Sequence, residues 1–237
     1  MWKLFFDTAY ALSFLIVFPA ARRRFRDWHL FGYREKLNDL LEKFPELRKK
    51  KMRLAKGGGC LAFIFNEQDV YRVRKRTAEA TTVLPRLERE KRITDALRRY
   101  CPVAIPNIKI IKGKKFVFYK TQFIPGVIMA NLPEKTLNAH ADEIAEQLAK
   151  ILKKLHSADP ASLYDLKDKK YKNRRWCHTD LCSNVLIDKK TFKITGIIDW
   201  EWACWGEIVW DFRSLYQHRH KMRRTEIPIK TVIKYYE

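Results

Sequence analysis

The sequence predicts an α+β fold with two lobes, a β-rich N-terminal lobe and a helical C-terminal lobe. Two pairs of β-type runs enclose one helical segment between about residues 55 and 121, whereas helical periodicity dominates after residue 127. A length of 237 residues with 46% hydrophobic residues is enough for two small lobes with packed cores. We therefore expect a leader over residues 1–36, an N-terminal lobe over 37–126 and a C-terminal lobe over 127–237.

The first 26 residues combine an apolar run with an arginine-rich segment. The run from Thr8 to Phe18 is shorter than the about 20 residues that a spanning helix needs. The arginines follow the run, which does not match a secretory signal. Two alternatives stay open for residues 1–26: a helix packed on the domain, or a helix in peripheral contact with the inner face of the membrane. Both leave the rest of the chain in the cytoplasm.

The chain is strongly basic, with 49 Lys and Arg against 27 Asp and Glu and a net charge of +22. Such a charge attracts polyanions, including nucleotides, nucleic acid and acidic glycans. The basic residues are spread along the chain, so solvated faces explain them as well as a dedicated anion-binding surface does. The cysteines contain no C-x-x-C pair, and Cys177, His178 and Cys182 lack the second pair that tetrahedral zinc requires. We expect reduced thiols.

Periodicity and turn residues place the elements of the N-terminal lobe. Gly113 marks the turn of the second strand pair, and Asn66–Gln68 mark that of the first. The predicted elements are a helix over 33–47, strands over 61–65 and 69–76, a helix over 82–100, and strands over 108–111 and 115–124.

The C-terminal lobe is predicted to contain a long helix over 139–156, a hairpin of strands 185–188 and 194–199, and a helical tail. The hairpin places Asp180 and Asn184, which precede its first strand, beside Asp199, which closes its second strand. Carboxylate and amide oxygens suit Mg²⁺. Phosphoryl transfer needs one acid on the metal and one that orients the acceptor hydroxyl. The hairpin therefore predicts a phosphoryl-transfer site.

Three motifs resemble those of the aminoglycoside phosphotransferase and choline kinase superfamily, whose members are relatives of protein kinases in fold. They are His178-Thr179-Asp180 followed by Asn184, Ile197-Ile198-Asp199-Trp200-Glu201, and Trp210-Asp211-Phe212. The resemblance runs from about residue 37 to 237 and implies a two-lobed protein-kinase-like fold. It implies that Asp180 is the catalytic aspartate and that Asp199 and Asn184 bind Mg²⁺. It also implies that His178 braces the loop and that Asp211 is a structural aspartate.

The catalytic loop departs from the family pattern in its spacing. The family usually places its asparagine five residues after the aspartate, whereas Asn184 follows Asp180 by four. Three alternatives stay open: Asn184 reaches the metal through an altered turn, Ser183 substitutes for it, or the site is impaired. The last alternative describes a pseudokinase-like scaffold that binds nucleotide without transferring phosphate.

The resemblance also implies that a basic residue on strand 69–76 binds the α- and β-phosphates. Arg72 is the expected residue and Arg74 the fallback, because strand alternation places both on one face. Glu90 is the expected partner acid on the following helix, with Glu88 as its rival, and an ordinary surface ion pair is the alternative for each.

Two backbone segments complete the expected nucleotide site. Gly57, Gly58 and Gly59 lie just before strand 61–65, where glycines allow backbone N–H groups to approach phosphate closely. A bare glycine turn is the alternative. Gln122 to Ile124 resembles the hinge whose backbone hydrogen-bonds the purine, and its side chains do not decide between ATP and GTP.

These features together predict a Mg²⁺-dependent enzyme that moves the γ-phosphate of ATP or GTP to a hydroxyl of a small molecule or sugar. Aminoglycosides and envelope-glycan sugars are the candidate acceptors. The short stretch between His156 and Cys177 argues against drug modification, and Phe18–Gly32 resembles the leader of some bacterial envelope-polysaccharide enzymes. A basic RNA- or membrane-binding module is a further alternative. Charge alone does not explain the paired acid motifs, so we do not expect nucleic acid as a partner.

Overall fold

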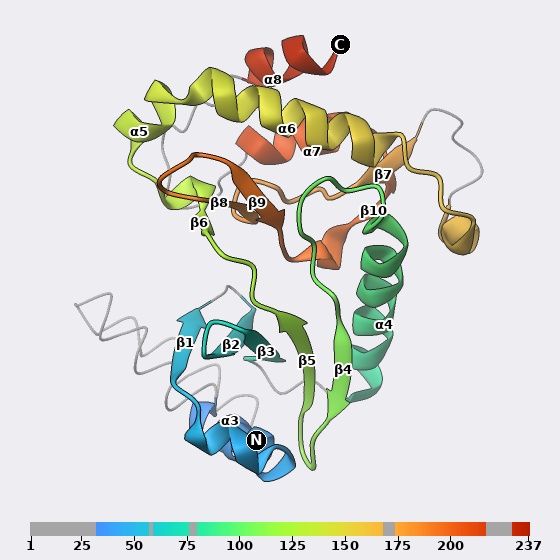
Figure 1. Cartoon of the computed structure of the whole chain (residues 1–237). Coiled ribbons are helices and arrows are strands. Elements are labelled where there is room, and N and C mark those ends of the chain that lie inside the picture. Colours follow the sequence, from blue (N-terminus) through green and yellow to red (C-terminus); the bar gives the residue numbers. More distant parts are fainter. Residues whose placement is uncertain (1–31, 57–58, 76–79, 168–173, 217–228) are drawn as a thin grey trace, which may run out of the picture. The chain divides into compact units, whose positions relative to one another are not determined.

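The structure, a computed structural model, describes residues 32–56, 59–75, 80–167, 174–216 and 229–237 (Figure 1). These residues form two compact units. The first contains the described residues up to Pro85 together with Lys109–Phe123, and the second contains Arg86–Ile108 with Ile124–Glu237. The apolar and basic segment over residues 1–26 lies outside the described ranges, as do Gly57 and Gly58. A search of the described ranges finds no helix with the length and hydropathy of a membrane span.

The first unit contains a five-stranded antiparallel sheet with the strand order β1-β2-β3-β5-β4. The strands are β1 (Met52–Lys56), β2 (Cys60–Phe65), β3 (Asp69–Arg74), β4 (Lys109–Lys112) and β5 (Val117–Gln122). Both predicted strand pairs are confirmed. The edge strand β1 was not predicted, because only Met52 and Leu54 of this basic segment pack against the core. The glycine segment therefore joins β1 to β2 and does not precede the first strand of the sheet.

Helix α3 (Tyr33–Lys43) packs on this sheet through Leu40, and the short 3-10 helix Pro45–Lys49 follows it. The buried carboxylate of Asp39 on α3 accepts the backbone N–H groups of Lys114 at 2.8 Å and Phe116 at 2.9 Å. A Cβ atom added at Gly113 would lie 2.3 Å from Oδ2 of Asp39. The predicted turn at Gly113 thus requires glycine, because a carboxylate occupies the space of a side chain.

Lys36 is buried on the inner side of α3, and we predict that it makes stability depend on pH. Its Nζ donates to the carbonyl of Lys75 at 3.3 Å and lies 4.7 Å from the ring centroid of Phe116. Burial lowers the pKa of Lys36 to about 8. The folded pKa lies below the ordinary value, so the unfolded chain binds more protons between pH 8 and 10.5. The contribution of Lys36 to stability therefore rises with pH across this window.

Urea unfolding of Lys36→Met and the parent at pH 7.5 and 10.5 tests this prediction. The free energy of unfolding of the parent, relative to Lys36→Met, should rise by up to about 3 kcal/mol between the two pH values. Lys43→Met is the control, because Lys43 is exposed on the same helix. A pH response equal in the two variants would show that Lys36 does not titrate as its burial implies.

The second unit consists of helices around two small antiparallel sheets, with the strand orders β6-β8-β9 and β10-β7. Its helices are α4 (Ala80–Leu97, from Arg86 onward), α5 (Glu134–Ala139), α6 (Ala141–His156), α7 (Val209–Tyr216) and α8 (Ile229–Tyr236). Its strands are β6 (Val127–Ile128), β7 (Arg175–Cys177), β8 (Val185–Ile187), β9 (Ile194–Ile197) and β10 (Cys204–Gly206). The predicted helices, hairpin and helical tail are confirmed, whereas the short strands β6, β7 and β10 were not predicted.

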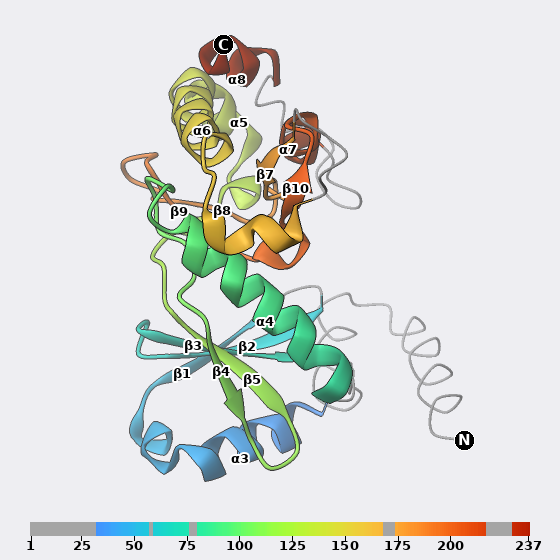
Figure 2. The ribbon, with the colours of Figure 1, turned by 90° about the vertical axis from the view of Figure 1, so that its right-hand side faces the viewer.

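Helix α6 forms the centre of this unit, because its apolar face is fully buried. Ile144, Leu148, Leu152 and Leu155 repeat at the spacing of one helix face and are inaccessible to solvent. Helix α8 lies beside α6 (Figure 2). The β8–β9 hairpin also joins the core, through Val185, Ile187 and Ile197. The hairpin thus packs into the same core as helix α6.

The extended segment before β4 runs beside β9 and forms a parallel β-bridge between Ala104 and Gly196. The N–H of Ala104 donates to the carbonyl of Thr195 at 3.2 Å, and the N–H of Ile197 donates to the carbonyl of Ala104 at 2.9 Å. A Cβ atom at Gly196 would lie 2.6 Å from the carbonyl oxygen of Ala104 and 2.7 Å from Cγ2 of Ile124. The missing side chain therefore permits the two backbones to approach.

Candidate active site

The loop from His178 to Asn184 is held by the buried side chain of Asp211 on α7. Oδ1 of Asp211 accepts the N–H of Thr179 at 2.6 Å, and Oδ2 accepts the N–H of His178 at 3.2 Å. Oδ2 also lies 3.0 Å from Nε2 of His156, at the end of α6. Asp211 and His156 are almost inaccessible to solvent. A buried carboxylate is stable only when it is hydrogen-bonded in this way, so Asp211 ties the loop backbone to the helical core.

Thr179 adopts a left-handed backbone conformation, with φ of 68°. This conformation costs a residue with a side chain about 1–2 kcal/mol, so neighbouring groups must maintain it. Asp211 binds the Thr179 N–H, and Oγ1 of Thr179 donates to the carbonyl of Trp202 at 3.0 Å. The strained residue lies immediately before Asp180 and is restrained at both its backbone and its side chain.

His178 joins the loop to the end of β9. Its Nε2 donates to the carbonyl of Ile198 at 3.0 Å, and its Nδ1 accepts the N–H of Asp180 at 3.2 Å. Its ring meets Trp200 edge to face at a centroid distance of 4.8 Å. Burial lowers the pKa of His178, so the ring is neutral and keeps one donor and one acceptor. These contacts support a bracing role for His178.

Asn184 remains beside Asp180 although the loop is one residue shorter than the family pattern. Its Nδ2 donates to the backbone carbonyl of Asp180 at 2.7 Å and to Oδ2 of Asp180 at 3.0 Å. The Asn184 side chain is buried. Because the amide nitrogen faces Asp180, Oδ1 is the atom of Asn184 that suits a metal ion. The shorter turn therefore still allows the amide of Asn184 to form hydrogen bonds with Asp180.

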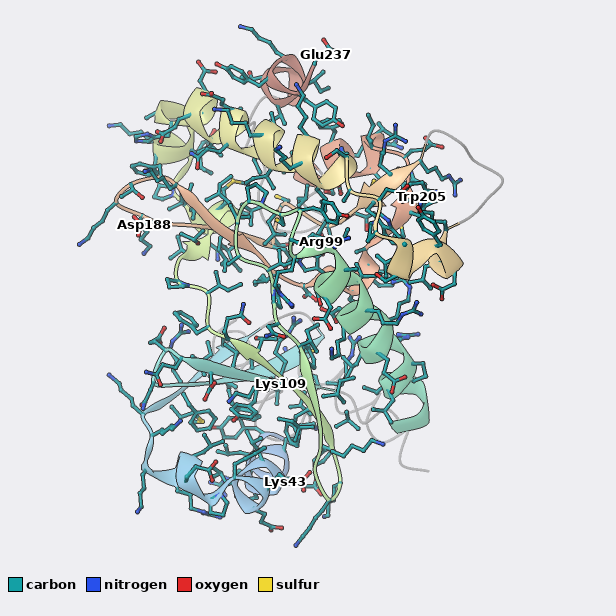
Figure 3. The ribbon with its side chains drawn as sticks, turned by 45° about the vertical axis from the view of Figure 1, so that its right-hand side comes forward. Lys43, Arg99, Lys109, Asp188, Trp205 and Glu237 are labelled. Carbon is teal, nitrogen blue, oxygen red and sulfur yellow. The ribbon has the colours of Figure 1, made fainter. Side chains whose placement is uncertain are left out.

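Asp199 lies at the same end of the β8–β9 hairpin as Asn184. The ladder pairs Val185 with Ile197, and the N–H of Ile198 donates to the carbonyl of Asn184 at 2.9 Å. The backbone of Asp199 is left-handed, with φ of 64° and ψ of 65°, where the chain leaves β9 for the 3-10 helix Trp200–Trp202. Figure 3 labels Asp188 at the turn that forms the opposite end of this hairpin. Asn184 and Asp199 thus lie at one end of the hairpin, and Asn184 contacts Asp180.

The first unit contains the residues expected to bind phosphates. Arg72 and Arg74 are half-buried on one face of β3, while Tyr71 and Val73 are buried on the other, which confirms the predicted alternation. The guanidinium of Arg72 lies 4.8 Å from the ring centroid of Tyr119 on β5.

Other residues expected to bind nucleotide fall in both units. Gly59 is exposed at the start of the β2 hairpin, and Gln122 is exposed at the end of β5. Glu90 and Ile124 belong to the second unit and are both buried. Glu88, the rival of Glu90, is exposed on α4. Burial makes Glu90 the better candidate for a fixed role, because a buried acid requires specific partners.

Sequence reasoning missed three residues that support the loop. His156 binds Asp211, Tyr236 binds His156, and Oγ of Ser214 accepts the N–H of Leu181 at 3.0 Å. One signal was present for His156, which continues the buried face of α6 four residues after Leu152. Ser214 and Tyr236 carry no local signal, because their contacts join segments far apart in the chain.

The cysteines contribute no disulfide, and all five are free. Sγ of Cys177 lies 3.5 Å from the carbonyls of Arg175 and Glu207, and burial raises its pKa well above the ordinary range. Burial also raises the pKa of Cys182 to about 11. These thiols are therefore protonated at neutral pH and behave as packing residues.

The match to a family model shows that the chain is a member of a phosphotransferase family. The chain matches the model of the APH family, described as the phosphotransferase enzyme family, over residues 63–168 and 163–237. These matches span most of the sequence, and the chain belongs to this family. No curated protein sequence matches the chain significantly.

Solved structures support the predicted fold. The streptomycin–ATP complex of APH(2″)-IIa covers 84% of this chain and 81% of its own, with a TM-score of 0.62 and 19% identity. The GDP complex of aminoglycoside 2′-phosphotransferase-IIIa covers 85% and 82%, with a TM-score of 0.66 and 17% identity. Macrolide 2′-phosphotransferase MphH from Brachybacterium faecium covers 85% and 82%, with a TM-score of 0.58 and 15% identity. The α+β, two-lobed kinase-like fold is thus confirmed.

Proposed function

We propose that the chain transfers the γ-phosphate of ATP or GTP to a hydroxyl of a small molecule or sugar, with Mg²⁺ as cofactor. The observation that carries this proposal is the arrangement of Asp180, Asn184 and Asp199 at one end of the β8–β9 hairpin. Family membership supports a phosphotransferase. The complexes of structural relatives with ATP, GDP or ADP support a nucleotide donor.

Asp180 is proposed as the catalytic aspartate. Its carboxylate orients the acceptor hydroxyl and receives the hydroxyl proton as the new O–P bond forms and the bond from phosphorus to the nucleoside diphosphate breaks. Asn184 holds this carboxylate through the bond from Nδ2 to Oδ2. Asp211 and His178 keep the loop backbone in place. Most of the rate enhancement comes from positioning, because the protein forms no covalent intermediate in this reaction.

Asp199 and Oδ1 of Asn184 would hold Mg²⁺. Both side chains offer the hard oxygen ligands that Mg²⁺ prefers. The hydrogen bond from the N–H of Ile198 to the carbonyl of Asn184 keeps the two residues at the same end of the hairpin. When bound, the ion neutralises charge on the phosphate oxygens.

The phosphates and base of the nucleotide are assigned to the remaining predicted residues. Arg72 is proposed to bind the α- and β-phosphates and Glu90 to be its partner acid. The backbone of Gly57, Gly58 and Gly59 is proposed to cover the phosphates. The backbone from Gln122 to Ile124 is proposed to bind the purine.

A sugar hydroxyl is the proposed acceptor. Aminoglycosides are polycations, and a net charge of +22 disfavours their approach relative to neutral or acidic sugars. Streptomycin and kanamycin are bound by structural relatives, which makes an aminoglycoside the rival acceptor. A basic segment over residues 1–26 that contacts the cytoplasmic face of a membrane would suit an envelope-glycan acceptor.

Metal dependence tests the assignment of Asp199. We expect transfer from Mg-ATP or Mg-GTP to a sugar panel to stop with EDTA and to resume with excess Mg²⁺. Asp199→Asn should raise the Mg²⁺ concentration for half-maximal activity by about tenfold or more, because the amide replaces a charged ligand. Asp188→Asn is the control, since Asp188 lies at the other end of the same hairpin. Equal Mg²⁺ dependence in the two variants would contradict the assignment.

The short loop favours one second function, a scaffold that binds nucleotide without transfer. A thermal shift with Mg-ATP or Mg-GTP, combined with no phosphorylated product from any acceptor, would support the scaffold. Product formation that depends on Asp180 would support the enzyme.

A further inference from the structure

Tyr236 on α8 is the outer member of a hydrogen-bonded chain that ends at the catalytic loop. Its hydroxyl lies 2.9 Å from Nδ1 of His156, whose Nε2 lies 3.0 Å from Oδ2 of Asp211. Asp211 in turn accepts the N–H groups of His178 and Thr179. Three side chains from α8, α6 and α7 thus connect the last helix to the residue that precedes Asp180.

The direction of these hydrogen bonds follows from the groups at each end. Asp211 offers only acceptor oxygens to His156, so Nε2 of His156 carries a proton and donates to it. With the ring proton on Nε2, Nδ1 is an acceptor, and the hydroxyl of Tyr236 donates to it. The tyrosine hydroxyl therefore selects the tautomer of His156 that Asp211 requires.

Packing fixes the tyrosine ring independently of its hydroxyl. The ring of Tyr236 meets Phe212 edge to face at a centroid distance of 5.2 Å and lies 5.5 Å from the ring of His156. Loss of the hydroxyl should leave these apolar contacts in place, so a phenylalanine at this position isolates the hydrogen bond.

We propose that Tyr236 is a positioning residue that holds the catalytic loop through His156 and Asp211. The inference rests on the proposed function, in which Asp180 is the catalytic aspartate. Thr179 has an unfavourable left-handed backbone, and its N–H bond to Asp211 restrains it. A His156 ring without its tyrosine partner adopts other tautomers and orientations, and Asp211 then holds Thr179 less firmly.

Amide hydrogen exchange of Tyr236→Phe tests the proposal without measuring turnover. Exchange at Thr179 and His178 should accelerate about fivefold relative to amides in α6, the change that loss of one neutral hydrogen bond produces. Tyr235→Phe is the matched control, because Tyr235 is a neighbouring exposed tyrosine on the same helix. Equal exchange at Thr179 in the two variants would overturn the proposal.

Steady-state kinetics, and the same substitution in a variant that lacks His156, test whether Tyr236 acts through His156. Tyr236→Phe should lower kcat about fivefold and change KM for the nucleotide less than twofold, because only the loop moves. In a His156→Gln background, Tyr236→Phe should produce no further change in Thr179 exchange, since Gln has no counterpart of Nδ1. A full additional effect there would show that Tyr236 acts through Phe212 instead. If the parent protein shows no turnover, the proposed function fails, and the exchange comparison still decides the role of Tyr236.

Discussion

Asp180→Asn is expected to lower kcat by about a thousandfold or more while the protein stays folded and binds nucleotide. Removal of a positioned general base costs about 10²–10⁴ in rate, and the carboxylate also orients the acceptor. The replacement has nearly the same shape, and its side-chain oxygen can still accept from Nδ2 of Asn184. The fold should therefore tolerate it.

Steady-state kinetics at saturating nucleotide and acceptor measure this effect, and nucleotide titration gives the affinity separately. Asp188→Asn again serves as the control and should keep kcat within twofold of the parent. A decrease in kcat of less than tenfold for Asp180→Asn would remove Asp180 from the chemistry. A large loss of nucleotide affinity would mean that the residue binds nucleotide rather than acceptor.

Asp211→Asn is expected to destabilise the second unit strongly. The carboxylate accepts N–H groups from His178, Thr179 and His156, and its replacement directs an NH₂ group at one of these donors. Hydrogen bonds to charged groups contribute about 1.5–3 kcal/mol, and unsatisfied buried donors cost a similar amount. We expect a decrease in the free energy of unfolding of about 2–4 kcal/mol.

Urea unfolding followed by circular dichroism tests this expectation. The control is Asp95→Asn, because Asp95 is an exposed acid on α4 that pairs with Lys91 and Arg98. Surface ion pairs contribute less than about 1 kcal/mol, so this control should change stability little. Similar midpoints for the two variants would show that Asp211 is not the anchor of the loop.

The sequence predicted the β8–β9 hairpin, because two apolar runs and a polar turn determine the register locally. It did not predict β1, since a basic edge strand with only two inward side chains shows little alternation. The strands β7 and β10 have three residues each, which is too short for a periodic signal.

Contacts between distant side chains were the least predictable part of the site. His156, Asp211 and Tyr236 lie 25 to 80 residues apart in the chain, and only tertiary packing brings them together.

The amide of Asn184 shows a second limit of prediction from sequence. Its spacing from Asp180 departs from the family pattern, yet the folded turn keeps Nδ2 within hydrogen-bonding distance of the aspartate. Spacing by itself was therefore a poor guide to contact.

The parallel bridge between Ala104 and Gly196 limits how this site can vary in evolution and in engineering. A methyl group at position 196 would overlap a main-chain oxygen, which no rotamer change can move aside. A related chain with a larger residue there must lead the segment before β4 along another path, and Asp199, which follows β9, would shift with it.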